Sequence, residues 1–437
     1  MSRPLVAAVL LVAALPPGLP AGELELHGFG SVRGIAVTGQ PSWLAGGFGR
    51  LTEGAAAPGE SDFTGRAKLH AALDWKPSDK VLLHVHGLAR AEPSSAGGDR
   101  VGVPEAYAVF RPELTPTVSL QLKAGLFFPG TSLENTERLW ASPYTISFSA
   151  LNTWLAEELR LTGLEGRILW SDGRDTLHAG GTAFVANDTL GTLIAWRGWS
   201  FGDRFTVVGE RLPLPPLASL QPGGAFAVQR ADGTRPIGEL DDRVGWMVRA
   251  GWERRGRAAL QAACFDNRGD RRLYSGEYAW DTRFWAIGAK LEPGAGFTLL
   301  GEALFGHTAM GVPGAGVSGS ASAPYPAAAS PAGGRAGAAF VDTRIAAAYA
   351  ILSWQRSAVR LSGRFDWFRN QDRDGVAEDL GEDGRGVTVA AFWTPVERLR
   401  IGAELLVVSA GRRAAEESGA DPDTDAWKAT LEARVSF

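Results

Sequence analysis

The last nine residues of the chain, "ATLEARVSF", alternate strictly between apolar and polar side chains. Ala429, Leu431, Ala433, Val435 and Phe437 are apolar, and the residues between them are polar. Successive side chains of a strand point to opposite faces, so this segment predicts a strand with one apolar and one hydrated face. A soluble sandwich would bury the apolar face in a core, whereas an outer-membrane barrel would turn it toward lipid.

The same alternation recurs in segment after segment of the chain. It is clear in "DFTGRAKLHAALDW", "VGWMVRAGW", "VRLSGRFDWF" and "RLRIGAELLVV". The connections between such segments are short and long in turn. About seven tight turns and about eight long loops predict about sixteen strands, with both termini on the short-turn side. We therefore predict an all-β protein, a transmembrane antiparallel barrel with short periplasmic turns and long extracellular loops.

The N-terminal residues 1–21 have the pattern of a secretory signal peptide. Arg3 precedes an apolar run from Leu5 to Leu15, and Ala21 is a small residue at the expected cleavage point. The run is shorter than the roughly 20 apolar residues that a spanning helix needs. We therefore expect residues 22–437 to be exported from a bacterial cytoplasm and to form the barrel in the outer membrane.

Aromatic residues occupy matching positions shortly before the short turns. These residues are Trp75, Trp170, Trp252, Trp354, Trp393 and, at the end of the last strand, Phe437. We expect them to form an aromatic girdle at one membrane interface, although Trp170 and Trp354 follow the apolar face of their strands less clearly. Nothing in the packing of a soluble sandwich requires tryptophans at one height on successive strands, so the pattern favours the barrel.

The signal sequence, the strand count, the long third loop and the C-terminal phenylalanine resemble those of the Gram-negative outer-membrane porins. The resemblance covers the whole mature chain in layout, without matching individual motifs. It implies a water-filled channel, a homotrimer, contact with outer-membrane lipid and lipopolysaccharide, and recognition of the last strand by the barrel-assembly machinery. It also implies that the third loop, residues 128–156, folds inward and constricts the channel.

The expected constriction loop carries several charged side chains. We expect Glu134, Glu137, Arg138, Glu157 and Glu158 to lie at the narrowest point of the channel. The alternative is that the loop only braces the barrel, with carboxylates that cap turns or pair with wall arginines.

Two other long connections have a distinctive composition. Residues 308–338 are rich in Gly, Ala, Ser and Pro, which predicts a flexible outer loop. The prolines of "RLPLPPLASLQPGG" predict that residues 188–238 form a stiff hood over the mouth of the barrel.

The predicted inward faces of the strands carry more bases than acids. The basic wall residues that we single out are Arg33, Arg66, Lys68, His70, His84, His86, Lys123, Arg360, Arg364 and Arg434. By resemblance to porins, the wall arginines of the first strands would face the acidic third loop across the channel. Alternatively, these charges pair with one another and keep the lumen wet. The excess of bases predicts a mild preference for anions.

Other classes of function find little support in the sequence. The formal net charge of −4 gives no indication of a nucleic-acid partner, and the single cysteine, Cys264, excludes an intrachain disulfide. His84 and His86 lie two residues apart without an evident third ligand, so we predict no metal. We also predict no catalytic residue and no cofactor.

We therefore predict a porin for passive diffusion of small hydrophilic solutes or ions. Two alternatives stay open. A clustered ladder of arginines at the neck would favour a substrate-selective anion or phosphate-type porin. A third loop that plugs the lumen would favour a non-conducting structural or adhesive surface barrel.

Overall fold

The computed structural model describes residues 22–91, 100–311, 340–374 and 378–437. The predicted signal peptide and residues 312–338 of the predicted flexible loop lie outside these ranges. Among the described residues, no helix is long and apolar enough to cross a bilayer.

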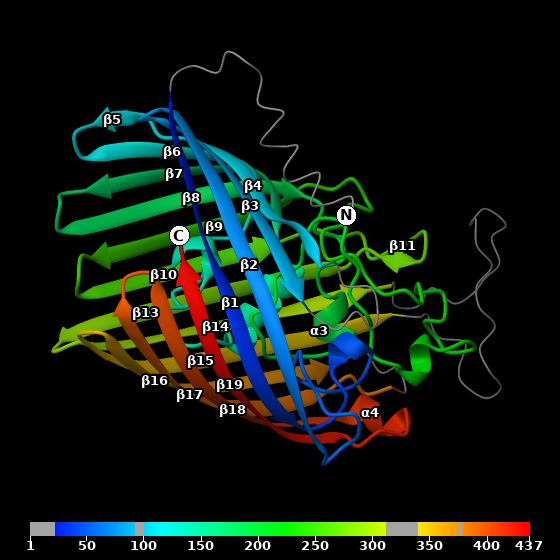
Figure 1. The fold of residues 1–437 in the computed structure, drawn as a ribbon. Coiled ribbons are helices and arrows are strands. Elements are labelled where there is room, and N and C mark those ends of the chain that lie inside the picture. The colour runs from blue at the N-terminus through cyan, green and yellow to red at the C-terminus, as the bar shows by residue number, and fades with distance from the viewer. Residues whose placement is uncertain (1–21, 92–99, 312–339, 375–377) are drawn as a thin grey trace.

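Sixteen long antiparallel strands of the described chain close into one barrel (Figure 1). They are β1 (Glu23–Thr38), β2 (Ser61–Ser78), β3 (Val81–Ala91), β4 (Val101–Phe110), β6 (Val118–Phe127), β7 (Leu161–Ser171), β8 (Asp175–Val185), β9 (Gly245–Arg254), β10 (Ala258–Asp266), β13 (Asp281–Gly294), β14 (Phe297–Met310), β15 (Val341–Arg356), β16 (Val359–Asp372), β17 (Glu382–Val396), β18 (Leu399–Arg412) and β19 (Asp423–Ser436). Neighbouring strands pair in chain order, and β1 also pairs with β19. This closure leaves no free edge in the wall and confirms the predicted barrel.

Shorter elements lie in the connections. They are β5 (Glu113–Thr115), which extends the β4–β6 turn, the strand pair β11 (Leu273–Tyr274) and β12 (Glu277–Tyr278), the α-helices α2 (Ala150–Glu158), α3 (Thr192–Trp196) and α4 (Arg413–Glu417), and the 3-10 turns η1 (Trp43–Ala45), η2 (Arg138–Trp140) and η3 (Ala218–Leu220). Tight turns join the strands at one end of the barrel, which we call the short-turn end, and α3 and α4 lie toward the other, the long-loop end (Figure 1).

The wall strands alternate between exposed and buried side chains, as the sequence predicts. Along β16, Leu361, Phe365 and Trp367 are exposed on the outside, whereas Arg364 and Asp366 are buried toward the lumen. An apolar outer face and a polar inner face are what a barrel in lipid requires.

The six aromatic residues of the predicted girdle all lie on the outward face near the short-turn end. Trp354 pairs with the outward Leu361, and Trp170 pairs with the outward Leu177, so both follow the same face as the others. The backbone of Phe437 exchanges hydrogen bonds of 2.9 and 3.0 Å with Gly28, which fixes the last residue against β1. Their role as an interfacial girdle stays a prediction.

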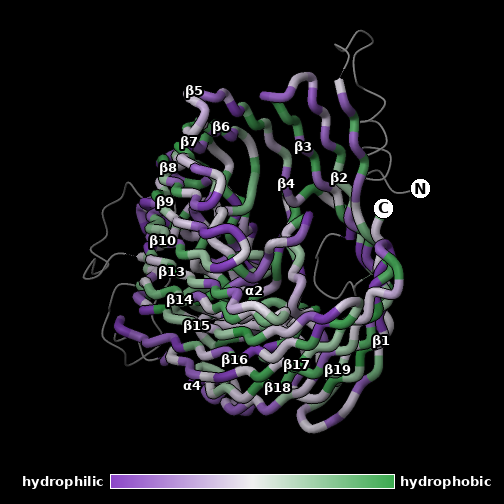
Figure 2. Tube along the Cα trace, turned by 90° about the vertical axis from the view of Figure 1, so that its left-hand side faces the viewer, coloured by the Kyte–Doolittle hydropathy of each residue, from purple (hydrophilic) through white to green (hydrophobic). Residues whose placement is uncertain are grey.

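The lumen is not empty, because two connections fold into it. Residues 128–160, which contain α2, pass inside the ring of strands (Figure 2), where α2 contacts β15 and β16. Residues 190–205 of the β8–β9 connection join them. Together they form what we call the lumen core, in which Trp154 packs against Phe284 and Phe201 packs against Phe368. Each fully buried aromatic side chain of this kind contributes about 1.5–3 kcal/mol.

This arrangement corrects one prediction. Residues 188–238 of the β8–β9 connection were expected to be a hood over the mouth, but the first part of this segment is not one, because Leu190, Ile194, Trp199 and Phe201 are fully buried within the barrel. Their apolar side chains pack on α2 through Trp154 and on the inner wall, where Phe368, Leu406 and similar residues replace the polar ones expected there. The proline-rich part that prompted the expectation packs against other long-loop residues through Leu212 and Leu217.

The outward orientation of β16 can be tested with an arginine scan. Phe365→Arg places a charge on the outer face at mid-strand, where it should cost about 2–4 kcal/mol, whereas Gln371→Arg on the same face near the long-loop end should cost about 0–1 kcal/mol. Denaturant unfolding from lipid vesicles measures both. Equal costs at the two positions would contradict the membrane-spanning placement.

Candidate functional site

The candidate site is a small hollow on the inner wall of β1–β3, which we call the basic hollow. Arg33, Arg66, Lys68 and Arg90 line it from the strands. Glu53 of the β1–β2 loop and Asp203, Arg204 and Phe205 of the β8–β9 connection close it from the lumen side. Its volume of about 30 Å³ is enough for one or two water molecules.

The strand register explains why so many bases gather here. Arg33 on β1 lies directly opposite Arg66 on β2, and Lys68 lies opposite Arg90 on β3. Like charges in such cross-strand positions repel one another. The row therefore needs carboxylates from elsewhere in the molecule, and the inward-folded connections supply them.

Asp203 is the main counterion of this row. It accepts two hydrogen bonds from the Arg33 guanidinium, of 2.9 and 2.7 Å, and it also contacts the Lys68 ammonium. Burial would raise the pKa of the Asp203 carboxyl, but Arg33 and Lys68 outweigh this effect and hold it well below its usual range. Asp203 is therefore an anion throughout the physiological pH range.

The remaining bases of the hollow have acidic partners as well. Arg90 donates a 2.7 Å hydrogen bond to Glu210, which also contacts Arg204, and the Arg66 guanidinium lies 3.8 Å from Glu53. Although burial opposes it, the ammonium of Lys428 and the guanidinium of Arg66 lower the pKa of Glu53. The hollow is thus a small, charged space beside the packed lumen core.

The predicted constriction loop folds inward, but three of its carboxylates lie away from the first strands. Glu134 is fully buried against β16, where the Arg364 guanidinium donates a 2.8 Å hydrogen bond to it. Glu134 also accepts hydrogen bonds of 3.0 and 3.1 Å from the amide of Ser149, the residue that caps α2. The expectation that this carboxylate faces the first-strand bases is therefore wrong.

Glu157 and Glu158 are also buried, and they join the two inward-folded connections. Glu157 accepts a 2.6 Å hydrogen bond from Arg197. Glu158 accepts hydrogen bonds from the Trp154 indole at 2.6 Å and from the amide of Leu193 at 2.8 Å. These two carboxylates were expected at the narrowest point of the channel, but they are fully buried and do not line a channel in this conformation.

Glu137 and Arg138 are the members of the predicted constriction set that stay exposed. Glu137 lies 3.3 Å from Arg400 and 3.6 Å from Arg434, which belong to the last two strands. Arg138 donates a 2.8 Å hydrogen bond to Glu25 on β1. The loop is therefore tied to the wall on both sides of the β1–β19 closure.

The ten predicted wall residues all lie on the inward faces of their strands, in different surroundings. Arg33, Arg66, Lys68 and His70 line the basic hollow. His84 and His86 lie on β3 next to it, and the Lys123 ammonium lies 4.1 Å from the centroid of the Tyr107 ring. Arg360 and Arg364 lie on the distant strand β16, and Arg434 lies on β19, which pairs with β1. The sequence did not indicate Asp203 and Glu53, because loop residues carry no periodic pattern that tells which way they point.

Arg364 is the most fully bonded of these wall residues. Besides Glu134, its guanidinium donates to Asp366 at 2.7 Å and to the carbonyl oxygens of Ser147 at 2.6 Å and Phe148 at 3.0 Å. A buried cation with this many partners fixes the third loop against β16.

Arg364→Ala should therefore release the third loop, because it leaves Glu134 and Asp366 buried without their cation, at a cost of about 3–5 kcal/mol. Hydrogen exchange of residues 128–160 should rise sharply. Arg360→Ala is the matched control, because Arg360 lies on the same strand face and touches the loop only through the Tyr144 ring, at 5.2 Å. Unchanged exchange in Arg364→Ala would contradict this anchoring role.

Glu158 gives the docking of the two connections a pH dependence. Burial raises the pKa of its carboxyl to about 7, above the value of about 4.3 expected in an unfolded chain. The docked state then binds more protons between these values, so docking is tightest at low pH and weakens as the pH rises through about 7.

Hydrogen exchange of α2, corrected for its intrinsic pH dependence, should therefore increase between pH 5 and pH 8. Glu158→Gln should reduce the increase, and Glu137→Gln, at an exposed position of the same loop, should retain it in full. The same increase in Glu158→Gln would show that another group is responsible.

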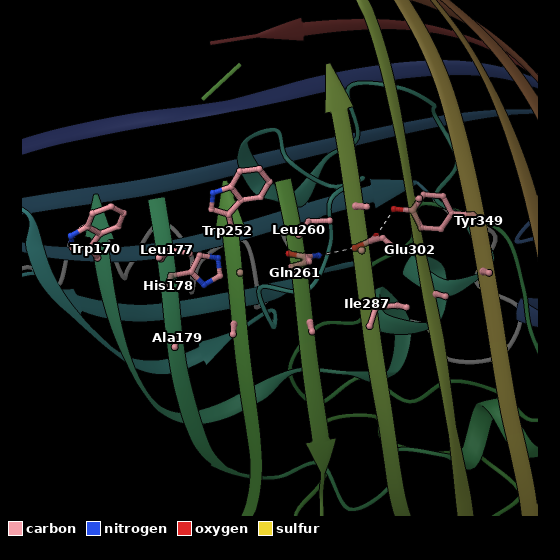
Figure 3. A pocket seen from close by; sticks show the side chains of 18 of the residues that line it. Trp170, Leu177, His178, Ala179, Trp252, Leu260, Gln261, Ile287, Glu302 and Tyr349 are labelled. Atoms are coloured by element: carbon pink, nitrogen blue, oxygen red, sulfur yellow. Dashed lines mark hydrogen bonds between the residues drawn. The ribbon is translucent and has the colours of Figure 1, made fainter. Parts of the chain in front are cut away.

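A larger hollow of about 1080 Å³ lies at β7–β10 and β13–β15 (Figure 3). Trp170, Trp252, Leu260 and Ile287 line it on the outer face of these strands. Inward-facing residues complete it, among them Glu302, which accepts a 2.9 Å hydrogen bond from Gln261. Because the outer lining is apolar and faces lipid, it is not suited to a hydrophilic solute.

Comparisons with known proteins support the architecture and no further detail. No protein-family model matches the chain, and no curated protein matches it significantly. Among solved structures, OmpF of Salmonella typhi in complex with daunomycin aligns with a TM-score of 0.51 at 11% identity, covering 95% of this chain and 98% of that one.

Two further channels align more loosely. The outer membrane channel DcaP of Acinetobacter baumannii and the anion-selective porin of Comamonas acidovorans both have a TM-score of 0.48 and 11% identity. The alignments cover 97% and 95% of this chain and the whole of those two. At such identities the similarity concerns the fold alone.

Proposed function

We propose that this chain, which has the barrel fold of the outer-membrane porins, is itself a porin for ions and small hydrophilic solutes. The observation that supports this most directly is the basic hollow. Arg33, Lys68 and Asp203 keep part of their surface accessible to water beside the packed lumen core.

The permeation path in this proposal runs along β1–β3. The lumen core occupies the side of β13–β18, where Phe284, Phe368 and Leu406 are in contact with the inward-folded connections. Water and small ions fit the basic hollow as it stands, since it holds one or two water molecules. Larger solutes pass only when residues around Asp203 shift.

The charges of the hollow favour anions mildly. Five basic residues line it, Arg33, Arg66, Lys68, Arg90 and Arg204, against the two acids Glu53 and Asp203. Glu210 and Glu432 lie directly behind and offset part of this excess through Arg90 and Arg33. The remaining positive potential concentrates anions in the hollow and does not exclude cations.

The cellular setting follows from the same proposal. Residues 1–21 direct export, the last strand engages the barrel-assembly machinery, and the chain assembles as a homotrimer in contact with lipid and lipopolysaccharide. The outward tryptophans near the short-turn end form the girdle at the periplasmic interface. The chain has no enzymatic activity in this proposal.

The lumen core supports a second candidate, a non-conducting structural or surface barrel. Trp154, Trp199 and Phe201 close the long-loop half of the lumen with apolar contacts that water does not wet. If the two connections never leave this position, the barrel presents only its outer loops to its surroundings.

Single-channel recording in planar bilayers under a KCl gradient distinguishes the two candidates. The porin predicts small ohmic steps with a reversal potential that indicates mild anion preference. Arg66→Glu should shift the reversal potential toward cation preference, because it changes the charge of the hollow by two units.

Arg413→Glu is the control, since Arg413 is an exposed residue of the outer helix α4 and should leave selectivity unchanged. Silence from barrels that are correctly folded would refute the porin and support the structural barrel.

A further inference from the structure

Four of the six histidines lie on the inner wall of β1–β3, and one of them is part of a cluster with carboxylates. The strand register places Glu25 opposite Asp74, and Asp74 opposite His84, in one row across β1, β2 and β3. His27 follows Glu25 two residues later on the same face of β1. This row lies close to the short-turn end, next to the tip of the third loop.

His27 has a buried nitrogen that lacks a hydrogen bond. Its side chain is 8% exposed, and its Nδ1 atom makes no hydrogen bond within the described part of the chain. Nδ1 lies 3.7 Å from an oxygen of Asp74 and 4.0 Å from an oxygen of Glu25. A buried polar atom without a partner is costly, and here three potential ligand atoms surround one point.

The Asp74 carboxylate is held in an orientation that suits a metal ligand. Its Oδ1 atom lies 2.5 Å from Nδ1 of His84, and the His84 ring stacks on Tyr107 with ring centroids 4.6 Å apart. The other oxygen, Oδ2, is the one that faces His27. A ligand carboxylate oriented by a neighbouring hydrogen-bonding group is a regular feature of metal sites.

We propose that Glu25, His27 and Asp74 bind a divalent transition-metal ion of the zinc class, with His84 orienting Asp74. One imidazole and two carboxylates suit zinc, whereas calcium and magnesium prefer all-oxygen shells. Ligand atoms around tetrahedral zinc lie about 3.4 Å apart. The 3.7 Å from His27 to Asp74 and the 4.0 Å from His27 to Glu25 are longer than this, and all three ligand atoms lie within 4.8 Å of one another, so binding needs small rotations of these side chains. The fourth position opens to the lumen past Glu25, which is one-third exposed.

Arg138 competes with the metal for Glu25. Its guanidinium donates a 2.8 Å hydrogen bond to Oε1 of Glu25, the same oxygen that faces His27, and Lys76 lies 3.5 Å from the other oxygen. A bound cation must displace Arg138 or repel it. Metal binding is therefore coupled to the position of the third loop, and removal of Arg138 should strengthen it.

One other cluster among the described residues could attract a cation. Asp188, Glu239 and Asp241 approach one another in the β8–β9 connection. It offers only oxygen ligands, and Asp188 already accepts hydrogen bonds from the amides of Leu240 and Asp241. If added zinc binds somewhere other than at His27, this cluster is the expected site.

The test is zinc binding to the purified, folded, full-length barrel, measured by competition with a chromogenic chelator. We expect one equivalent, weakened at least ~10-fold by His27→Gln and by Asp74→Asn, and ~10–100-fold by His84→Gln. His178→Gln, a lumen histidine on β8, should have no effect, and Arg138→Gln should raise the affinity.

Heat-modifiable electrophoretic mobility checks the folding of each variant. If His27→Gln does not fold, Asp74→Asn and the visible spectrum of Co²⁺ bound to the unmodified protein test the site instead. Cobalt with four or five ligands absorbs far more strongly than six-coordinate cobalt, so an intense spectrum is expected. Undiminished binding in the His27 and Asp74 variants, or its loss in Glu239→Gln, would overturn the proposal. None of these measurements requires the barrel to conduct.

Discussion

The buried ion pair between Arg364 and Glu134 is the interaction on which the arrangement of the lumen depends. It fixes the start of the third loop against β16, at an N–O distance of 2.8 Å, and so determines where α2 lies. Trp154 and the other apolar residues of α2 then pack on the β13–β18 side of the wall. Residues 190–205 of the β8–β9 connection complete this core, and Asp203 near the end of that segment reaches the opposite wall.

The two sides of the lumen consequently have different physical characters. On one side, apolar wall residues and apolar loop residues exclude water from each other. On the other side, the row of bases on β1–β3 requires counterions and leaves a small charged hollow between wall and loops. If apolar loop residues covered the row of bases as well, these charges would be buried without partners, at a cost that the apolar contacts could not offset.

The wall could be predicted from the sequence because a strand in a barrel has only two faces. Alternation alone placed Arg33, Lys68, Arg364 and the others inside and Phe365 and Trp393 outside. The loops could not be predicted in the same way, since no periodicity tells whether a loop carboxylate pairs with a wall base or with another loop. Glu158, expected at a constriction, instead binds the amides at the start of α3.

One signal in the sequence could have corrected the expected hood. The stretch "TLGTLIAWRGWSF", residues 189–201, is far more apolar than a solvated outer loop should be. Likewise, Asp74 becomes a partner of Glu25 and His27 only through the register of β1 and β2, which a single sequence does not reveal.

The central claim is that solutes pass beside β1–β3 and not beside β17. It is tested most directly by single-cysteine variants in a Cys264→Ala background, treated with a charged thiol reagent during current recording. Lys68→Cys, in the basic hollow, should lose conductance on modification, whereas Ala390→Cys, buried on the inner face of β17, should be unaffected. Modification of Ala390→Cys with loss of current, and none at Lys68→Cys, would contradict this account.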